Sequence, residues 1–263
     1  MLSVCVFGLG EAGSEIARDI ATQGVNVNAF DPAPIATPTG VIRHAEPGTA
    51  VLDVDLILAV TAGGDSEQAL RQALDEIPAA CLYADLASAS PKLKGRLADV
   101  AAGRGVLFAD VALMATVPGR GVRTPALASG TGAEKVASVM GEFGMPIDVV
   151  AGEAGVAAGH KLVRSVVMKS LAAALIESVR ASDALGIARP SWDNLVGQLG
   201  ALNEEFLIRL IDGTGTHHVR RREEMQAAFD LLTELGVEPA MTTATLRSLD
   251  AVAAHGVPSV PPQ

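Results

Sequence analysis

The first 150 residues alternate between short apolar runs and longer segments in which apolar positions recur every three or four residues. The short runs are typical of buried strands, and the longer segments are typical of amphipathic helices. This alternation predicts a parallel sheet with helices on both faces. The expected strands are 4–7, 25–30, 41–42, 56–60, 80–84, 105–109, 126–129 and 146–150, and the expected helices are 11–17, 65–77, 91–102 and 133–143.

After Gly155 the pattern is almost entirely helical. A long apolar helix cannot bury its surface by itself, so this region predicts a helical domain that packs against a partner subunit. The expected helices are 156–185, 191–209, 221–235 and 242–254, with a loop at 213–216 and a loose tail from 258 to 263. The fold class is therefore expected to be α/β, an N-terminal Rossmann-type parallel-sheet domain over 1–152 followed by an all-helical domain over 153–263.

Three glycines follow the first expected strand in the spacing G-x-G-x-x-G. Gly8 allows the tight turn, Gly10 lets a pyrophosphate approach the backbone, and Gly13 lets the helix pack close to the strand. The phosphates would lie on the N-terminus of that helix. The alternative is a glycine-rich turn with only a structural role.

A second apolar run ends at Asp31, about 20 positions after the last glycine of this motif. In dinucleotide-binding folds, an acidic residue at this spacing binds the adenosine ribose. A carboxylate there accepts hydrogen bonds from the ribose 2′-hydroxyl and repels a 2′-phosphate, and the next basic residue is Arg43. These features favour NAD over NADP. The expected cofactor contacts are Gly8, Leu9, Gly10, Glu11, Ala12, Gly13, Asp31, Val60, Thr61, Ala62 and Ser88.

Two serines follow the strand that is expected to end at Asp85. In an open parallel sheet, ligands bind beyond the carboxyl ends of the strands. Ser90 precedes Pro91 and is expected to cap the next helix, because serine before a proline at the first helical position is a common start. Ser88 either shares that capping role or faces the ligand.

Lys161 lies one or two turns into the long helix, after a glycine- and alanine-rich start, and Ser165 follows four residues later on the same face. A lysine whose pKa is lowered by desolvation can act as an acid–base catalyst. The alternative is a lysine whose stem lies along apolar surface while its ammonium reaches solvent.

The chain resembles the β-hydroxyacid dehydrogenases, which are related to 6-phosphogluconate dehydrogenase, in three motifs that occur in the same order. Residues 8–13 resemble the family's G-L-G-x-x-G motif, residues 85–91 its D-x-S-T-x-S-P motif, and residues 152–161 its G-x-x-G-x-x-x-x-x-K motif. The resemblance covers nearly the whole chain. Segments 117–121, 161–165 and 221–225 resemble a branch with a phosphogluconate dehydrogenase-type C-terminal domain. The resemblance implies that Lys161 is the general acid–base residue.

The chain departs from that family at the substrate. The family has asparagine where this chain has Ser165, and a Ser-Gly-Gly turn that binds a substrate carboxylate where this chain has Met114, Ala115 and Thr116. Cationic side chains could compensate for the lost turn, although the basic stretch 217–222 could also be an exposed face capped by the glutamates at 223 and 224. In relatives, C-terminal residues reach a neighbouring subunit's site. The expected substrate contacts are Ser88, Met114, Ala115, Thr116, Arg120, His218, Arg221 and Arg222.

Composition and charge narrow the kinds of partner, metal site and location that the protein is expected to have. The formal net charge of −10 argues against nucleic acid or an anionic membrane as a partner. Cys5 and Cys81 each lie inside an apolar run and are expected to be core residues, and no metal site is expected. Charges at Arg164, Lys169 and Glu177 favour a buried helix over a membrane span. No leader precedes the first strand, so a cytoplasmic location is expected.

Together these features predict an NAD(P)-dependent oxidoreductase, expected to be a homodimer, that acts on the hydroxyl-bearing carbon of a small anionic hydroxy acid or on its keto form. The alternatives within enzymes are an imine reductase and a decarboxylating sugar-acid dehydrogenase. The alternative of another class is a dinucleotide-binding sensor without catalysis.

Overall fold

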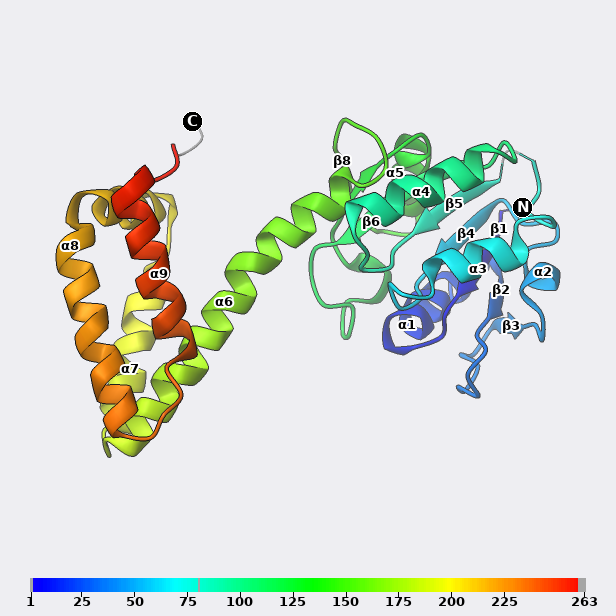
Figure 1. The fold of residues 1–263 in the computed structure, drawn as a ribbon. Coiled ribbons are helices and arrows are strands. Elements are labelled where there is room, and N and C mark those ends of the chain that lie inside the picture. Colours follow the sequence, from blue (N-terminus) through cyan, green and yellow to red (C-terminus); the bar gives the residue numbers. More distant parts are fainter. Residues whose placement is uncertain (1, 80, 260–263) are drawn as a thin grey trace. The chain divides into compact units, whose positions relative to one another are not determined.

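The computed structural model describes residues 2–79 and 81–259, and it divides into two compact units, Met1–Arg164 and Ser165–Gln263 (Figure 1). The first unit contains a sheet with helices around it, and the second is helical. The expected fold class is confirmed. The division between the units falls inside the long helix α6 (Val156–Ala184), whereas the boundary at 152/153 proposed from the sequence lies in the turn before it.

The strands of the first unit lie close to the apolar runs from which they were predicted. They are β1 (Ser3–Phe7), β2 (Asn26–Phe30), β3 (Val41–Arg43), β4 (Leu56–Ala59), β5 (Leu82–Asp85), β6 (Leu107–Leu113), β7 (Ala126–Ser129) and β8 (Ile147–Val149). The helices are α1 (Glu11–Ala21), α2 (Pro47–Ala50), α3 (Ser66–Ala73), α4 (Pro91–Ala102), the 3-10 turn η1 (Gly121–Arg123) and α5 (Ala133–Glu142). Ala80, the first residue of one predicted strand, lies outside the described residues.

Among the described residues, the strands form one eight-stranded sheet in the order β3-β2-β1-β4-β5-β6-β7-β8. The neighbours from β3 to β6 pair in parallel, β7 runs antiparallel to β6, and β8 is parallel to β7. The chain moves outward from β1 in one direction to β2 and then in the other to β4. Ligands bind at such a switch point, beyond the carboxyl ends of the strands, and the glycine loop after β1 lies there.

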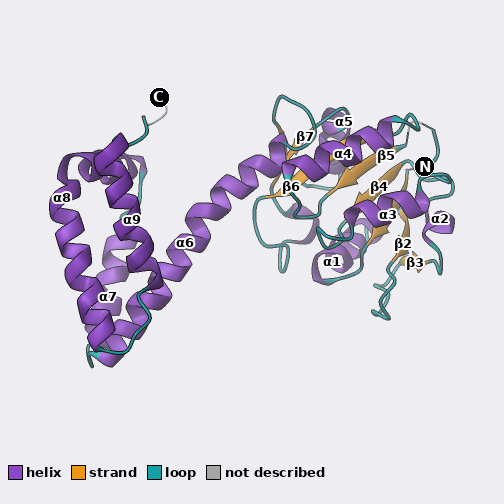
Figure 2. Cartoon of the chain, viewed as in Figure 1, coloured by secondary structure: helices purple, strands orange, loops and turns teal. Residues whose placement is uncertain are grey.

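Helices cover both faces of the sheet (Figure 2). The strand side chains alternate between two cores, one on each face. Val4 and Val6 of β1 pack with residues of α1 and α5, whereas Cys5 and Phe7 pack with residues of α3 and α4. This period of two is the geometry of a strand that is buried on both faces. Cys5 and Cys81 are free and buried, as expected from the sequence.

The predicted end of β6 is wrong. The strand was expected to stop before Asp110, but it continues to Leu113. Its last four residues pair antiparallel with β7, from Asp110 opposite Ser129 to Leu113 opposite Ala126. Asp110 therefore lies inside a paired strand with both neighbours fixed.

The single helix predicted over 191–209 is also wrong. The chain forms α7 (Ala188–Leu199) and then starts α8 (Glu204–Glu234). Gly200 ends α7, and the side chain of Asn203 caps α8 by accepting a hydrogen bond from the amide of Phe206 at 2.8 Å.

The loop predicted at 213–216 is wrong as well, because these residues lie inside α8. The hydroxyls of Thr214 and Thr216 donate to carbonyls one turn earlier, at Leu210 and Asp212. The non-helical residue is His217, with φ −117° and ψ 23°, which places a kink directly after the glycine-rich stretch.

The second unit is completed by α9 (Ala240–His255), which packs along α8 (Figure 1). The carboxylate of Glu177 on α6 accepts hydrogen bonds from the first amides of α9, at 2.7 Å from Met241 and 2.9 Å from Thr242. An anion at a helix N-terminus is favoured by the helix dipole, so this contact fixes α9 to α6. Of the predicted tail, residues 260–263 lie outside the described residues. No helix within 2–79 and 81–259 has the length and apolar character needed to cross a bilayer.

Truncation of Leu58 tests the sheet core. The side chain is fully buried on β4, between Val6 and Ala84 of the neighbouring strands. We expect Leu58→Ala to lower the free energy of unfolding of the first unit by roughly 2–5 kcal/mol because it leaves a cavity. Hydrogen-exchange mass spectrometry of the β1, β4 and β5 peptides measures this loss. The control is Leu52→Ala at an exposed leucine, which should change protection by less than about 0.5 kcal/mol. Equal effects of the two variants would contradict the assignment of Leu58 to the core of the sheet.

Candidate functional site

The three glycines of the loop after β1 meet different constraints. Gly8 has φ +89°, and a Cβ there would lie 2.6 Å from the carbonyl oxygen of Val60. A Cβ on Gly13 would lie 1.9 Å from the carbonyl oxygen of Gly8, whereas a Cβ on Gly10 would meet no atom within 4 Å. Packing therefore requires Gly8 and Gly13, while open space lies over Gly10. Gly10 is also the N-cap of α1, so unpaired amides and the positive end of the helix dipole border that space, as a pyrophosphate requires.

Asp31, at the end of β2, is fixed by two backbone amides. One oxygen of its carboxylate accepts from Leu9 at 2.6 Å, and the other accepts from Ala33 at 2.8 Å. The guanidinium of Arg43 donates to the carbonyl of Asp31 at 2.7 Å and to those of Ala33 and Ile35. The loop after β2 is thus held from both sides, with a carboxylate beside the glycine loop.

A cavity of about 330 Å³ lies between these two loops. Five of the predicted cofactor contacts besides Asp31 line it, among them Val60. The lining includes Gly8, Gly10, Asp31, Pro32, Ile35, Thr61, Ala62, Asp65 and Gln68. The structure therefore brings together the glycine loop, the acidic residue and the segment after β4, in the arrangement that an adenosine and its phosphates would need.

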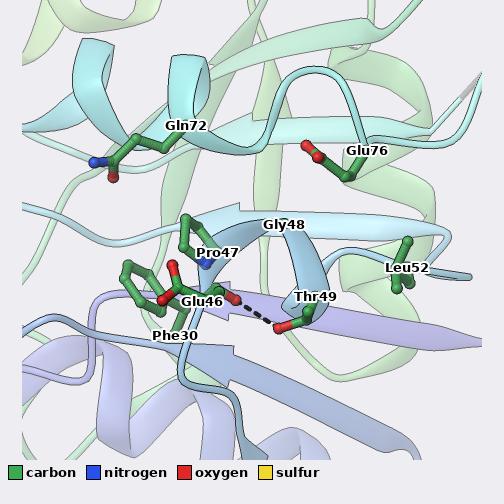
Figure 3. A pocket seen from close by; sticks show the side chains of 8 residues that line it. All are labelled: Phe30, Glu46, Pro47, Gly48, Thr49, Leu52, Gln72 and Glu76. Atoms are coloured by element: carbon green, nitrogen blue, oxygen red, sulfur yellow. Dashed lines mark hydrogen bonds between the residues drawn. The ribbon is translucent and has the colours of Figure 1, made fainter.

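A second pocket of about 400 Å³ shares Phe30 and Gln72 with that cavity (Figure 3). Glu46 and Glu76 contribute carboxylates, and the hydroxyl of Thr49 donates to the carbonyl of Glu46 at 2.9 Å. None of the site residues predicted from the sequence lines this pocket.

The two alternatives for the serines after β5 are separated by their contacts. Ser90 caps α4, because its hydroxyl accepts from the amide of Leu93 at 3.2 Å. Ser88 instead accepts a hydrogen bond from the amine of Lys161 at 2.8 Å. Segments 73 residues apart in the chain thus bring a hydroxyl and an amine into contact.

The surroundings of Lys161 change its acidity. Burial lowers the pKa of the Lys161 amine, the positive charges of Lys94 and Arg164 lower it further, and Asp110 opposes them. The amine is therefore held by a hydroxyl in a partly desolvated site, which differs from a lysine whose end is freely solvated.

Asp110 has a partner that the sequence did not indicate. One of its carboxylate oxygens accepts from the amides of Gly155 at 3.0 Å and Ala158 at 2.9 Å, at the start of α6. The hydroxyl of Ser129 accepts from the amide of Ala157 at 3.1 Å. These bonds supply acceptors to amides that have no partner within the helix.

Asp110 also contacts Lys94, and sequence reasoning missed both residues and Arg164. A signal was present for Lys94. It precedes Leu97 and Ala101 by three and seven residues, so a lysine occupies the buried face of α4. No such signal marked Asp110, because its partners come from a distant helix.

The segment Met114–Thr116 follows β6 and is bordered by two arginines. Arg164 donates to the carbonyl of Met114, and Arg120 donates to the hydroxyl of Thr116 at 3.1 Å. Both guanidinium groups keep further donors, and both side chains are exposed. Two cations therefore lie where the sequence expects substrate contacts.

The remaining predicted residues lie in the second unit, where His218, Arg221 and Arg222 have local partners. His218 Nδ1 lies 2.9 Å from the carbonyl oxygen of Gly215, Arg221 donates to the hydroxyl of Thr214, and Arg222 pairs with Asp250 on α9 at 2.6 Å. Ser165 is half-buried, one turn after Lys161 on α6. Arg220 pairs with Glu224 at 3.4 Å, so part of this basic stretch is neutralised at the surface.

Several solved structures share the fold. An imine reductase from Myxococcus stipitatus, V8 variant in complex with NAD+, is 22% identical with a TM-score of 0.80, over 98% of this chain and 96% of that chain. A reductive aminase from Aspergillus terreus in complex with NADPH and ethyl levulinate is 19% identical with a TM-score of 0.78, over 98% and 95%. A conserved protein of unknown function with structural similarity to 3-hydroxyacid dehydrogenases is 25% identical with a TM-score of 0.62, over 96% and 97%.

A curated relative matches over a shorter region. An uncharacterized 28.5 kDa protein from the 7S RNA 5′ region of Methanothermus fervidus is 29% identical over 119 residues, which is 45% of this chain and 47% of the relative. The chain therefore spans about half the length of the curated relative that it matches.

Family models match both parts of the chain. Residues 183–262 match a domain of unknown function, DUF1932. Residues 3–160 match the NAD binding domain of 6-phosphogluconate dehydrogenase, which confirms the resemblance seen in the sequence. With its glycine loop, its acidic residue after β2 and this match over more than half of its length, the chain belongs to the family of the NAD binding domain of 6-phosphogluconate dehydrogenase.

Proposed function

We propose that this protein is an NAD-dependent oxidoreductase that transfers a hydride between nicotinamide and the hydroxyl-bearing carbon of a small anionic hydroxy acid. The observation that carries the proposal is the contact of 2.8 Å between the amine of Lys161 and the hydroxyl of Ser88. A lysine with a lowered pKa, placed beyond the carboxyl ends of the strands, is suited to acid–base catalysis.

The chain's own residues supply a cofactor site. The amides at the start of α1 would bind the pyrophosphate, Asp31 would accept from the adenosine ribose, and residues 60–62 would lie along the dinucleotide. When bound, the nicotinamide would accept or supply the hydride. The negative charge of Asp31 favours NAD, since it repels a 2′-phosphate, and Arg43 is already bonded to three carbonyls.

Lys161 would move the proton. As a neutral amine it takes the proton of the substrate hydroxyl during oxidation, and as an ammonium it returns that proton during reduction. Its lowered pKa moves the equilibrium between the ammonium and the neutral amine toward neutral pH. Ser88 and Ser165 would orient the substrate oxygen.

The substrate's negative charge would be met by arginine. Arg120 and Arg164 border the segment Met114–Thr116, and a guanidinium can bind a carboxylate with two parallel hydrogen bonds. We further propose that His218, Arg221 and Arg222 contribute from the helical domain, in their own or in a partner subunit's site.

Imine reduction is the second candidate. The imine reductase and reductive aminase structures share this fold, and Met114 and Ala115 make one side of the expected substrate segment apolar. In such a reaction the ammonium of Lys161 would donate its proton to the substrate nitrogen. Comparing oxidation of hydroxy acids with reduction of cyclic imines distinguishes the two candidates.

We also propose that the protein is a homodimer, with a second copy on α6 and α7. Many large apolar side chains there are exposed, Val163, Val166 and Val167 by 73%, 67% and 64%. Exposed apolar surface of this extent marks protein–protein contacts.

Substitution of Lys161 tests the chemistry. We expect Lys161→Met to lower kcat by about 10²–10⁴-fold without weakening the binding of NAD, because only proton transfer is lost. In the wild type, the rate of oxidation should rise with pH through an apparent pKa below that of ordinary lysine, and this limb should be absent from the variant. Steady-state kinetics across pH and calorimetric NAD binding measure both. Lys169→Met, an exposed lysine of the same helix, is the control, and full turnover by Lys161→Met would end the assignment.

Substitution of Asp31 tests cofactor choice. We expect Asp31→Asn to narrow the preference for NAD over NADP by about tenfold or more, since the repulsion of the 2′-phosphate disappears. Dissociation constants for both cofactors give the ratio. The control is Asp65→Asn, a carboxylate that lines the same cavity, and an identical shift in both variants would locate the selectivity elsewhere.

A charge on α6 tests the dimer. We expect Val166→Asp to convert the protein to monomers, because a dimer interface would bury the new carboxylate without a partner. Sedimentation velocity measures the mass. Asn194→Asp adds a charge at an exposed polar position of α7 and should leave the dimer intact. A wild-type protein that sediments as a monomer would refute the proposal directly.

A further inference from the structure

Three charged side chains are completely enclosed where β5, β6 and α4 meet. The side chains of Asp85, Lys94 and Asp110 have no exposed surface. The amine of Lys94 donates to the carbonyl of Asp85 at 2.7 Å, and it lies 3.4 Å from the carboxylate of Asp85 and 3.2 Å from that of Asp110. One ammonium is therefore shared by two carboxylates.

The two aspartates are direct neighbours across the sheet. The register of the parallel strands β5 and β6 places Asp85 opposite Asp110. Burial raises the pKa of Asp85, the charge of Asp110 adds to that effect, and Lys94 opposes it. Oδ2 of Asp85 has no hydrogen-bond partner among the described residues, and Oδ1 of Asp110 has only the ion pair with Lys94 at 3.2 Å. The charge of Lys94 is therefore the main compensation for burying this pair.

Asp110 links the cluster to the start of α6 through hydrogen bonds. The same carboxylate that faces Lys94 accepts from the amides of Gly155 and Ala158, and an anion at the positive end of a helix is favourable. Lys161 lies on the next turn, three residues after Ala158, and contacts Ser88 in the segment that follows Asp85. Both partners of the contact between Lys161 and Ser88 are thus tied to the cluster.

We propose that Asp85, Lys94 and Asp110 form a positioning cluster for Lys161, in which Lys94 pairs with both carboxylates and Asp110 fixes the first turn of α6 so that Lys161 meets Ser88. The proposal rests on the proposed role of Lys161 as the acid–base residue. Lys94 is not a catalytic residue, since it acts only through the groups that hold Lys161.

The cluster also sets the charge around Lys161. The charges that face the amine are Lys94 from α4 and Arg164 from α6, which lower its pKa, and Asp110 from β6, which raises it. Removing the charge of Lys94 therefore shifts the pKa of Lys161 upward. Water admitted by a loosened α6 would shift it in the same direction, because desolvation is the largest lowering cause.

Competitive labelling with acetic anhydride across pH tests this proposal without requiring turnover, because only the neutral amine reacts. Mass spectrometry of the peptide that contains Lys161 gives the labelling midpoint. We expect Lys94→Met to raise that midpoint by about half a pH unit or more, and to lower kcat while the dissociation constant for NAD stays unchanged. Lys94→Arg, which keeps the charge, should restore the wild-type midpoint. The matched control is Lys92→Met, an exposed lysine of the same helix.

A second variant covers the case in which Lys94→Met does not fold. The double variant Asp85→Asn/Lys94→Met keeps the cluster's formal charge, and it should still raise the midpoint because Lys94, and not Asp85, is among the charges that shift the pKa of Lys161. A folded variant of either kind with the wild-type midpoint would overturn the proposal. A wild type without turnover counts against the proposed function alone, since the labelling midpoints test the cluster separately.

Discussion

The carboxylate of Asp110 is the interaction on which the candidate site depends. A helix begins with amides that its own carbonyls cannot reach, and at the start of α6 those amides are closed off from water by the sheet. Asp110 supplies the acceptor from the middle of a paired strand, where its backbone cannot shift. The candidate acid–base residue therefore stands on a helix whose origin is fixed to the sheet, and the loop that carries Ser88 leaves the neighbouring strand.

Such an arrangement is costly for stability. A buried ion pair or triad often contributes less than well-packed apolar groups of the same volume, yet removing one partner is strongly destabilising. The cluster of Asp85, Lys94 and Asp110 is thus better explained by the geometry it imposes than by the stability it adds. The rest of the first unit supplies that stability through two aliphatic cores, one on each face of the sheet.

Much of the site could be predicted because it depends on spacing and on strand order. The positions of the glycine loop, of Asp31 and of Ser88 follow from the rule that ligands bind beyond the carboxyl ends of parallel strands. Lys161 was indicated by its place near the start of the long helix and by the family resemblance, and its contact with Ser88 was not predicted. Asp110 and Arg164 could not be found in this way, since their partners are set by how one distant segment packs on another. The helical unit shows the same limit. Gly200 ends a helix, whereas Gly213 and Gly215 lie within one, so the presence of glycine alone did not show where the helices end.

The loop after β2 has a consequence for how a nucleotide would be received. Leu9 and Ala33 already hold both oxygens of Asp31, and Arg43 already ties the loop's carbonyls together. Little conformational freedom remains to be lost there when a ligand arrives, and ordering of loops is among the terms that weaken association. The adenosine end of this fold is thus a stiff template, against which even a modest misfit in the ribose cannot be absorbed by local adjustment.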